Sequence, residues 1–548
     1  MEVIHQCIFL IKNKKFNEAK KILNDVTTAV QLDTKWNLLG IIESELKNYS
    51  DSVIYFKKAL KISPNNTIYN FNLGIALEKN LKIAKSIQQL KICIKKNHQV
   101  IDCLISISNQ LIKKKKLNFA LQILLKSKIN DVRINYNIAF IYNLLNEINL
   151  AKQNILRSLD INSKNIESLF LYAEILKKDY HYDDAIVIYK KIIDINPKHE
   201  LSILNLANTY GRLDKYYESI KNYKYLLKLN KNNKDALFFL TQLYLKKNTV
   251  NKLELENFEQ RFNQYKDAVP YLYDKTKQWN GEFVNTLLIW GEQGIGDHIF
   301  FSKYLLETCQ LVKKILFQTD RRLINLFQNF FTKNNIYNIE ILDIKKKVEN
   351  YDAQAPIGSL LTILKKKPFA DSKFNKLLES DKLLINNFSH KINKQDLNIG
   401  ISWKSLNNNE NYRNINLTLI FDYFKNLSNI KFHNLQFGYS ENEINNGSSN
   451  HKLTIWKEID YTNDLDSVAA LIENMDYVLT VQNTVAHMSC ALQKKTLLLA
   501  PLGARWYWGS NDIDKWYGSA QIFRQHKLLD WSYPLKMLVS FIENERKK

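Results

Sequence analysis

Apolar positions in the first 250 residues recur with a helical period, and small residues interrupt them at nearly constant spacing. Antiparallel helices need a small residue where their axes come close, while larger apolar residues fill the grooves between neighbouring pairs. The pattern predicts about seven stacked helical pairs over residues 1–247, forming a right-handed superhelix with a concave face. The small residues are Ala19, Ser52, Ser86, Ala120, Ala151, Ala185 and Ser219, at intervals of 33, 34, 34, 31, 34 and 34 residues.

The repeat beginning at Trp36 carries further marker residues. It resembles the tetratricopeptide repeat at Trp36, Leu39, Gly40, Ser52, Phe56, Ala59 and Pro64. This resemblance implies a protein partner on the concave face. Asn70, Asn135, Asn205 and Asn208 are either ligands for an extended peptide backbone or ordinary polar positions on inner helices.

The period changes near residue 280, where short apolar runs begin to alternate with helical stretches. This rhythm is typical of parallel strands joined by helices. We expect strands at 284–290, 312–318, 397–403, 431–436, 477–481 and 496–500. The predicted fold is an α superhelix followed by α/β, with two Rossmann-like domains. Its parts are the repeats (1–247), a linker helix (248–278), two halves (279–390 and 391–530) and a C-terminal helix (531–548).

A glycine-rich turn, Gly291-Glu292-Gln293-Gly294-Ile295-Gly296-Asp297, follows the first of these strands. Glycines such as Gly294 and Gly296 let a phosphate approach the exposed N–H groups at a helix start. A Walker loop is excluded because G-K-[ST] is missing. A dinucleotide fingerprint lacks its third glycine, since Ile299 stands there, but Asp320 keeps that interpretation open. A purely structural turn is the remaining alternative.

Five ordered segments between residues 283 and 530 resemble the heptosyltransferase-like family, glycosyltransferase family 9. They are LLIWGEQGIGDHIFFSKYL, ISWKSLNNNENYRNINL, FHNLQFG, DYTNDLDSVAALIENMDYVLTVQNTVAHMSCALQKKTLLLAP and the pair RWYWG with WYGSAQIFRQ. The resemblance implies a GT-B arrangement in which a nucleotide sugar binds the C-terminal half and the acceptor enters from the N-terminal half. It also implies an inverting transferase.

The resemblance assigns the catalytic base to Asp297, for which a helix N-cap is the alternative role. His298 is a weaker catalytic candidate. Lys404 and Arg413 are candidates for the donor phosphates, since one is a point charge and the other a bidentate fork. Gln482, Asn483, Thr484 and His487 follow a strand and open the next helix, whose free N–H groups suit phosphate, and Arg505 is a further donor-binding candidate.

One segment departs from the family, which commonly has Asp-Thr where Gln482-Asn483 stand. That departure puts heptose as the donor sugar in doubt and supports a rival class, a non-catalytic repeat scaffold with a degenerate transferase-like domain. Repeats followed by two Rossmann-like halves are also similar to protein O-GlcNAc transferases, so a protein is the first acceptor to test and a glycan the second. We expect the two turns, 291–297 and 482–487, to line one crevice wide enough for an activated sugar.

Composition excludes several functional classes of protein. The net charge of +23 comes from 68 Lys and only 10 Arg spread along the chain, which differs from the localised basic patch of a nucleic-acid protein. Five scattered cysteines contain no CxxC pair, and no stretch has the length of a membrane span. We therefore expect a cytoplasmic protein that binds no nucleic acid. We expect no metal and no cofactor beyond the nucleotide-sugar substrate.

Overall fold

The computed structural model describes residues 2–26, 32–96, 99–264, 275–365, 376–405, 408–439, 443–444, 453–512 and 514–547. The chain divides into two compact units, Met1–Pro197 and Lys198–Lys548, called here the N-terminal and C-terminal units. Part of the predicted linker helix, 265–274, lies outside the described residues.

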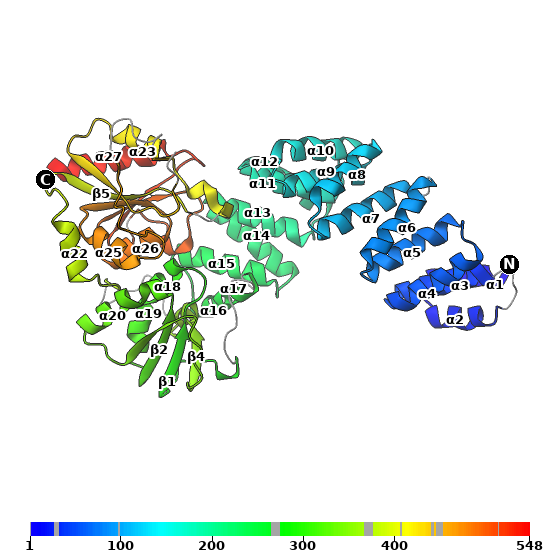
Figure 1. Cartoon of the computed structure of the whole chain (residues 1–548), viewed down its shortest axis with the longest axis horizontal. Helices are drawn as coiled ribbons and strands as arrows, with labels where there is room; N and C mark the ends of the chain where they lie inside the picture. The colour runs from blue at the N-terminus through cyan, green and yellow to red at the C-terminus, as the bar shows by residue number, and fades with distance from the viewer. Residues whose placement is uncertain are drawn as a thin grey trace. The chain divides into compact units, whose positions relative to one another are not determined.

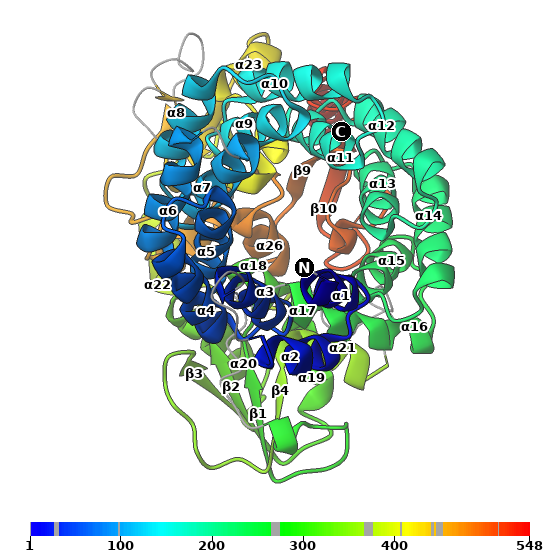
Figure 2. The same cartoon turned by 90° about the vertical axis from the view of Figure 1, so that its right-hand side faces the viewer.

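The N-terminal unit consists of antiparallel helical pairs that follow one another along a curved path (Figures 1 and 2). The predicted small residues are fully buried between paired helices, and the Ser52 and Ser86 hydroxyls donate hydrogen bonds to the carbonyls of Gly40 and Gly74 at 2.8 and 2.7 Å. The sequence period thus marks the helix crossings. The helices are α1 (Glu2–Lys12), α2 (Phe16–Asn24), α3 (Leu32–Glu45), α4 (Tyr49–Ile62), α5 (Thr67–Lys79), α6 (Ile83–Lys95), α7 (Val100–Lys113), α8 (Leu117–Ser127), α9 (Val132–Leu144), α10 (Ile148–Ile161), α11 (Ile166–Lys178) and α12 (Tyr182–Ile195).

The C-terminal unit begins with three more helices of the predicted repeat region, which lie side by side in Figure 2. Ser219 again donates to a carbonyl twelve residues earlier, at 2.7 Å to Ala207. These helices belong to the same compact unit as the sheets that follow. They are α13 (Glu200–Arg212), α14 (Tyr216–Leu229) and α15 (Lys234–Lys246), and short helices follow at α16 (Lys252–Glu256), η2 (Asn257–Gln260) and α17 (Arg261–Gln264).

The first sheet has four parallel strands in the order β3-β2-β1-β4. The strand predicted at 284–290 is found as β1, and the helix expected after it is split at Ser302 into α18 and α19. The elements are β1 (Thr286–Trp290), α18 (Ile295–Phe301), α19 (Lys303–Thr308), β2 (Lys314–Thr319), η4 (Arg321–Leu323), α20 (Ile324–Lys333), β3 (Ile339–Asp343), β4 (Ala353–Pro356), η5 (Ile357–Ser359), α21 (Leu360–Ile363) and α22 (Lys382–Ser389).

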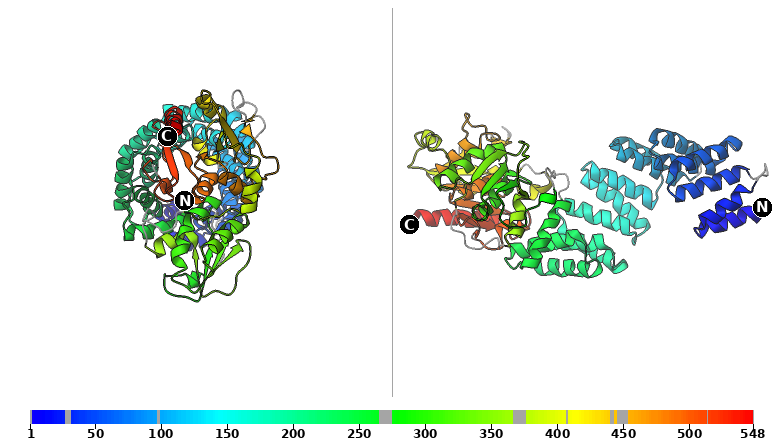
Figure 3. Two further views of the ribbon diagram at one scale, coloured as in Figure 1. Left: turned by 90° about the vertical axis from the view of Figure 1, so that its left-hand side faces the viewer. Right: turned by 90° about the horizontal axis from the view of Figure 1, so that it is seen from below.

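The second sheet has six parallel strands in the order β10-β9-β8-β5-β6-β7, which is the strand order of a doubly wound fold. The strands predicted at 477–481 and 496–500 have these bounds in the structure. The C-terminal helix, drawn in red in Figure 3, packs on α23 and β10. The elements are β5 (Leu397–Ser402), η6 (Asn408–Arg413), α23 (Leu417–Phe424), β6 (Ile430–Asn434), β7 (Leu453–Thr454), α25 (Leu465–Glu473), β8 (Tyr477–Val481), α26 (Thr484–Ala491), β9 (Thr496–Ala500), η7 (Trp506–Trp508), β10 (Ala520–Arg524) and α27 (Ser532–Lys547).

Both sheets reverse their strand order between two neighbouring strands, β1 and β4 in the first and β5 and β8 in the second. Open α/β sheets bind ligands at the carboxyl ends of strands beside such a reversal. The turn at 291–297 follows β1, and the turn at 482–487 follows β8. The topology therefore brings both candidate segments to these edges.

Candidate functional site

The glycine-rich turn is fixed in place by a buried ion pair. The carboxylate of Glu292 accepts two hydrogen bonds from the Arg261 guanidinium, at 2.9 and 2.7 Å, and a third from the Gly358 N–H at 2.8 Å. Both charged side chains are almost completely buried. Since Gly358 lies two residues after β4, Glu292 links the two strands that flank the reversal, and its role is to hold the turn.

Asp297 lies in the first turn of α18, and its side chain bends back so that Oδ2 accepts a hydrogen bond from the Gly294 N–H at 3.2 Å. It is the third residue of the helix, so Gly294 holds the N-cap position that was the alternative for Asp297. Burial raises the pKa of Asp297 to about 6, although the nearby Arg505 guanidinium and the Gly294 N–H favour its carboxylate form. The group therefore titrates close to neutral pH, which suits an acid or a base.

His298 follows Asp297 in α18 and packs against the start of the turn. Its ring lies under Gly291, and Nδ1 is 3.0 Å from the Thr319 hydroxyl and accepts a hydrogen bond from the Asp320 N–H at 3.4 Å. Burial lowers the pKa of His298 to about 4, so the ring is neutral at pH 7. His298 is thus a packing residue beneath the turn.

The dinucleotide interpretation loses its acidic residue in this structure. Asp320 accepts two hydrogen bonds from the Arg322 guanidinium, at 2.8 and 2.9 Å, and caps the short helix η4. Ile299, at the third glycine position, is fully buried. The dinucleotide fingerprint needs an acidic side chain that can bind a ribose hydroxyl. In this structure the Asp320 carboxylate is already paired with Arg322.

The second turn ties the ends of β5 and β8 together. Asn483 is the N-cap of α26, accepting from the Ala486 N–H, and its Nδ2 donates to Ser402 Oγ at 2.7 Å and to the Lys404 carbonyl at 3.2 Å. Its amide is thus fully used by the fold. Thr484 is the half-exposed first residue of α26.

Gln482 lies between two arginines. Its carbonyl accepts a hydrogen bond from Arg413 Nη1 at 3.0 Å, and its Oε1 accepts one from the Arg505 N–H at 3.3 Å. Its Nε2 is buried and has no hydrogen-bond partner among the described residues. Burial, together with neighbouring Arg505 and Arg212, lowers the pKa of Arg413 to about 10. Positive charge is therefore concentrated at the carboxyl end of β8.

The two turns meet directly. Gly296 packs against the imidazole of His487, whose Nδ1 is 3.0 Å from the Tyr517 hydroxyl. Burial and the Arg413 charge lower the pKa of His487 to about 3, which keeps this ring neutral. The structure thus brings the two predicted segments together, but aromatic side chains fill the space between them.

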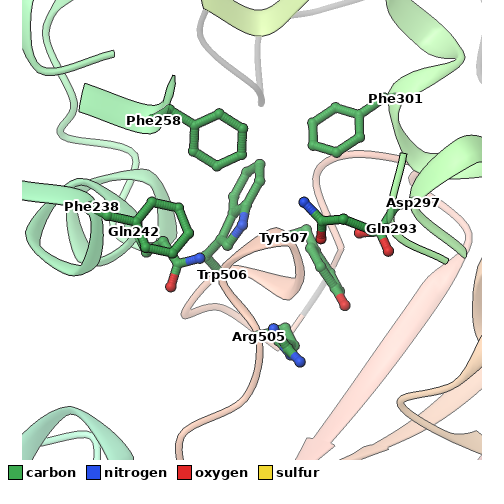
Figure 4. A pocket seen from close by; sticks show the side chains of 9 residues that line it. All are labelled: Phe238, Gln242, Phe258, Gln293, Asp297, Phe301, Arg505, Trp506 and Tyr507. Carbon is green, nitrogen blue, oxygen red and sulfur yellow. The ribbon is translucent and has the colours of Figure 1, made fainter. Parts of the chain in front are cut away.

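A small cavity remains beside Asp297, with a volume of about 20 Å³. Figure 4 shows its lining side chains, which come from three parts of the C-terminal unit: α15 and η2, the turn with α18, and the segment after β9. The volume fits about one water-sized group. The expected crevice for an activated sugar is therefore closed at this point. The lining residues are Phe238, Gln242, Phe258, Gln293, Asp297, Phe301, Arg505, Trp506 and Tyr507.

A second hollow of about 380 Å³ lies at the carboxyl end of β5. It is lined by Trp403, the residues from Asn414 to Thr418, and Glu443. Lys404 does not face the Asp297 cavity, because its Nζ is paired with both Glu443 carboxylate oxygens at 2.7 Å. The volume lies in the usual range for small-molecule sites.

Sequence reasoning missed the α15 and η2 side of the cavity and the Arg261–Glu292 pair. Arginine usage carries a signal for the ion pair alone, since Arg261 is one of only 10 arginines in the chain. Among the residues that the structure describes, no group of three or more acidic, histidine or cysteine side chains is arranged to hold a metal. Within the same residues, no helix is long and apolar enough to cross a bilayer.

Comparison with known proteins identifies the repeats. A tetratricopeptide-repeat family model matches residues 36–66, 132–165 and 166–199. The N-terminal half of the chain thus carries tetratricopeptide repeats, as predicted, and an α/β region with parallel sheets follows.

Two curated proteins are similar to parts of the chain. Protein FlbA of Caulobacter vibrioides is 26% identical over 288 residues, which cover 49% of this chain and 48% of FlbA. A TPR repeat-containing protein of Borreliella burgdorferi is 33% identical over 75 residues, which cover 13% of this chain and 33% of that protein. The chain spans about half the length of FlbA.

Solved structures are also similar to part of the chain. The C-terminal part of a TPR repeat-containing protein from Cytophaga hutchinsonii is 17% identical, with a TM-score of 0.36, and the match covers 43% of this chain and 98% of that one. PilF of Pseudomonas aeruginosa is 16% identical, with a TM-score of 0.33, covering 38% and 96%.

Proposed function

We propose that this repeat protein transfers a sugar from a nucleotide-sugar donor to an acceptor hydroxyl on a protein or glycan. In this proposal the two sheets form a GT-B transferase that needs no metal, and the repeats recruit the acceptor or a partner protein. The observation that carries the proposal is that Asp297 and Arg505 line one cavity. Asp297 follows β1 of the first sheet, and Arg505 follows β9 of the second. An acidic group from one half and a cation from the other are what acid–base catalysis on an anionic donor requires.

The proposed reaction is a direct displacement with inversion. The acceptor oxygen attacks the anomeric carbon, the bond from that carbon to the phosphate oxygen breaks, and the nucleoside diphosphate leaves with the electron pair. The proton of the acceptor hydroxyl passes to an oxygen of Asp297. Arg413 and Arg505 offset the charge that develops on the leaving diphosphate.

Charge supports an anionic ligand. Burial lowers the pKa of Arg413, and the guanidinium groups of Arg505 and Arg212 lie close enough to lower it further. The carboxylate of Asp297 acts in the opposite direction. His487 stays neutral, so it adds no charge. A diphosphate would balance the excess positive charge and give the Gln482 amide an acceptor.

A non-catalytic scaffold is the second candidate, and one observation favours it. The turns at 291–297 and 482–487 are packed against each other, and the cavity between the halves is about 20 Å³. In that case the repeats bind a partner protein and the α/β region is a structural extension of the array. Transfer by the first candidate requires Gly296 and His487 to separate so that the donor can enter.

Nucleotide binding distinguishes the two candidates. The melting temperature is measured with UDP, GDP, ADP and NAD, because a ligand at 100 times its Kd stabilises the folded state by about 2.7 kcal/mol. A shift with a nucleoside diphosphate supports the transferase, a shift with NAD alone supports a dehydrogenase, and no shift with any nucleotide supports the scaffold.

Catalysis is tested with Asp297→Asn. Turnover of the donor that binds should be lost while the nucleotide-induced melting shift is retained, since the base and the diphosphate site are different groups. Asp343→Asn, at the end of β3 in the same sheet, is the control and should leave turnover unchanged. Normal turnover by Asp297→Asn would remove Asp297 from the mechanism.

A further inference from the structure

Helix α15, in the predicted repeat region, forms one wall of the cavity beside Asp297. Phe238 of α15 packs against Phe258 with ring centroids 6.0 Å apart, and Phe258 packs edge-on against Trp506 at 5.7 Å. α15 also contacts η7, which carries Trp506 and Tyr507. The end of the repeat region is thus joined to the sheets through this wall.

Two carboxamide side chains face the cavity from opposite sides. Figure 4 shows Gln242, from α15, across the cavity from Gln293, which lies in the glycine-rich turn beside Asp297. Neither amide makes a hydrogen bond within the described part of the chain, although each carries donor and acceptor atoms. Two free amides, a carboxylate and the Arg505 guanidinium therefore surround a space walled by aromatic rings.

These groups match a particular kind of ligand. Amides and a carboxylate recognise a hydroxyl, which both donates and accepts, and aromatic faces pack against C–H groups. The volume of about 20 Å³ fits a hydroxyl on a narrow stem. A serine or threonine side chain has the required size and chemistry.

We propose that Gln242 binds the acceptor hydroxyl opposite Asp297, so that the last predicted repeat helix is part of the acceptor site, and that this site takes a serine or threonine side chain. This inference rests on the proposed transferase function. Gln242 and Gln293 orient the hydroxyl, its proton passes to Asp297, and its oxygen forms the new bond to the anomeric carbon as the nucleoside diphosphate leaves. α15 thereby links acceptor selection to the repeat region.

The test uses the full chain and the nucleotide sugar that it turns over. The probes are N-acetylserinamide, N-acetylthreoninamide, N-acetylalaninamide and methyl glucoside, with products identified by mass. Wild type should glycosylate the serine and threonine amides. Gln242→Ala should raise the KM for these amides at least tenfold and leave the KM for the donor within twofold.

Gln153→Ala is the matched control, since Gln153 is an exposed glutamine of α10 in the N-terminal unit. Unchanged acceptor KM in Gln242→Ala, or transfer to methyl glucoside in preference to the serine and threonine amides, would overturn this inference and leave the transferase standing. A wild-type chain that turns over no nucleotide sugar would overturn both. Equal melting temperatures of wild type and Gln242→Ala show that a KM change is not loss of folding.

Discussion

Gly296 in α18 packs directly against the imidazole ring of His487 in α26, so the two predicted ligand-binding turns touch each other at this point. A Cβ atom on Gly296 would lie 2.8 Å from Cδ2 of His487. The ring cannot easily move aside, because its Nδ1 is 3.0 Å from the Tyr517 hydroxyl and its centroid is 4.9 Å from that of Trp508. This contact leads to the first prediction.

Gly296→Ala should destabilise the C-terminal unit by about 1–3 kcal/mol, which is the usual cost of overpacking. Gly294→Ala is the control, because its added Cβ would meet only Asp297 Oδ2 at 3.5 Å. Unfolding in denaturant is followed by tryptophan fluorescence, since eight of the nine tryptophans lie after residue 198. Equal stability of the two variants would show that the turns are not in tight contact.

The repeat region shows how much a regular sequence determines. Each small residue of the predicted series is buried at a helix crossing because the repeat requires the same local geometry every time. Strands β8 and β9 were predicted with their observed bounds because each is a short and largely apolar run that turn-forming residues follow.

The strands that were not predicted are β3, β4, β7 and β10, and none of them is a continuous apolar run. β4 is Ala-Gln-Ala-Pro, which contains no β-branched or aromatic residue, and it becomes a strand because β1 pairs with it. β10, Ala-Gln-Ile-Phe-Arg, is likewise a strand by its pairing with β9.

The candidate site was predicted only in part. A local motif identified Asp297 and the turn after β8, because glycine spacing and helix starts are local features. The α15 and η2 side of the cavity depends on contacts between residues far apart in the chain, such as Phe258 with Trp506, and no local pattern reports these. His298 and Asn483 look like ligand-binding residues in sequence, yet their polar atoms are used by Thr319 and Ser402.

Asp297→Asn should stabilise the protein at neutral pH. Because the pKa of Asp297 is raised to about 6, the folded state binds more protons than the unfolded state between about pH 4 and 6, so this group lowers stability as the pH rises through that window. Removing the charge should add about 1–3 kcal/mol at pH 7.5 and almost nothing at pH 4. Thermal unfolding at both pH values measures the difference, and an equal effect at both would contradict the raised pKa.

Glu292→Gln should cost about 3 kcal/mol of unfolding free energy, because it leaves the buried Arg261 guanidinium with an incomplete set of charged partners. Glu340→Gln is the control, since Glu340 pairs with Lys314 at the surface, where an ion pair contributes less than about 1 kcal/mol. Both residues belong to the first sheet and its loops, so the same fluorescence signal reports both. A loss below 1 kcal/mol for Glu292→Gln would show that the pair does not hold the turn.

Gly503→Ala tests the joint between α13 and the second sheet. Gly503 has a φ of +66°, and a Cβ there would lie 2.7 Å from the Arg212 carbonyl oxygen. Arg212 also stacks its guanidinium 4.4 Å from the ring centroid of Tyr412, beside Arg413. The free energy of unfolding should therefore fall by about 1 kcal/mol because of backbone strain. The clash with the Arg212 backbone, which cannot rotate away, should lower it further.

The control for Gly503→Ala is Gly281→Ala. Its φ is +98°, so an alanine there has the same kind of backbone strain. The added Cβ would lie 3.3 Å from an Ile363 methyl group, which is a milder contact than the one at Gly503. Gly503→Ala should also weaken nucleoside-diphosphate binding, because the loop it distorts carries Arg505. Destabilisation no larger than that of Gly281→Ala would show that α13 does not press on this loop.

Stability should fall as the pH drops from 6.5 to 4.5, and buried histidines give the reason. Burial lowers the pKa to about 4 for His298 and His433 and to about 3 for His487. In this window the unfolded chain binds protons that the folded state does not, so each of these histidines makes stability rise with pH. Asp297, Asp466 and Asp514 act in the opposite direction, because burial raises the pKa of each carboxyl. Each histidine that stays neutral in the folded state should lower the free energy of unfolding by about 2 kcal/mol at pH 4.5 relative to pH 6.5.

His487→Gln should therefore flatten the pH dependence by about 2 kcal/mol across that window, whatever its effect on stability at neutral pH. Denaturant unfolding at several pH values gives the slope for both proteins, and comparing slopes removes the packing change caused by the substitution. An unchanged slope would mean that His487 is protonated in the folded state. A cationic ring beside Arg413 would then add to the charge that the proposed diphosphate has to balance.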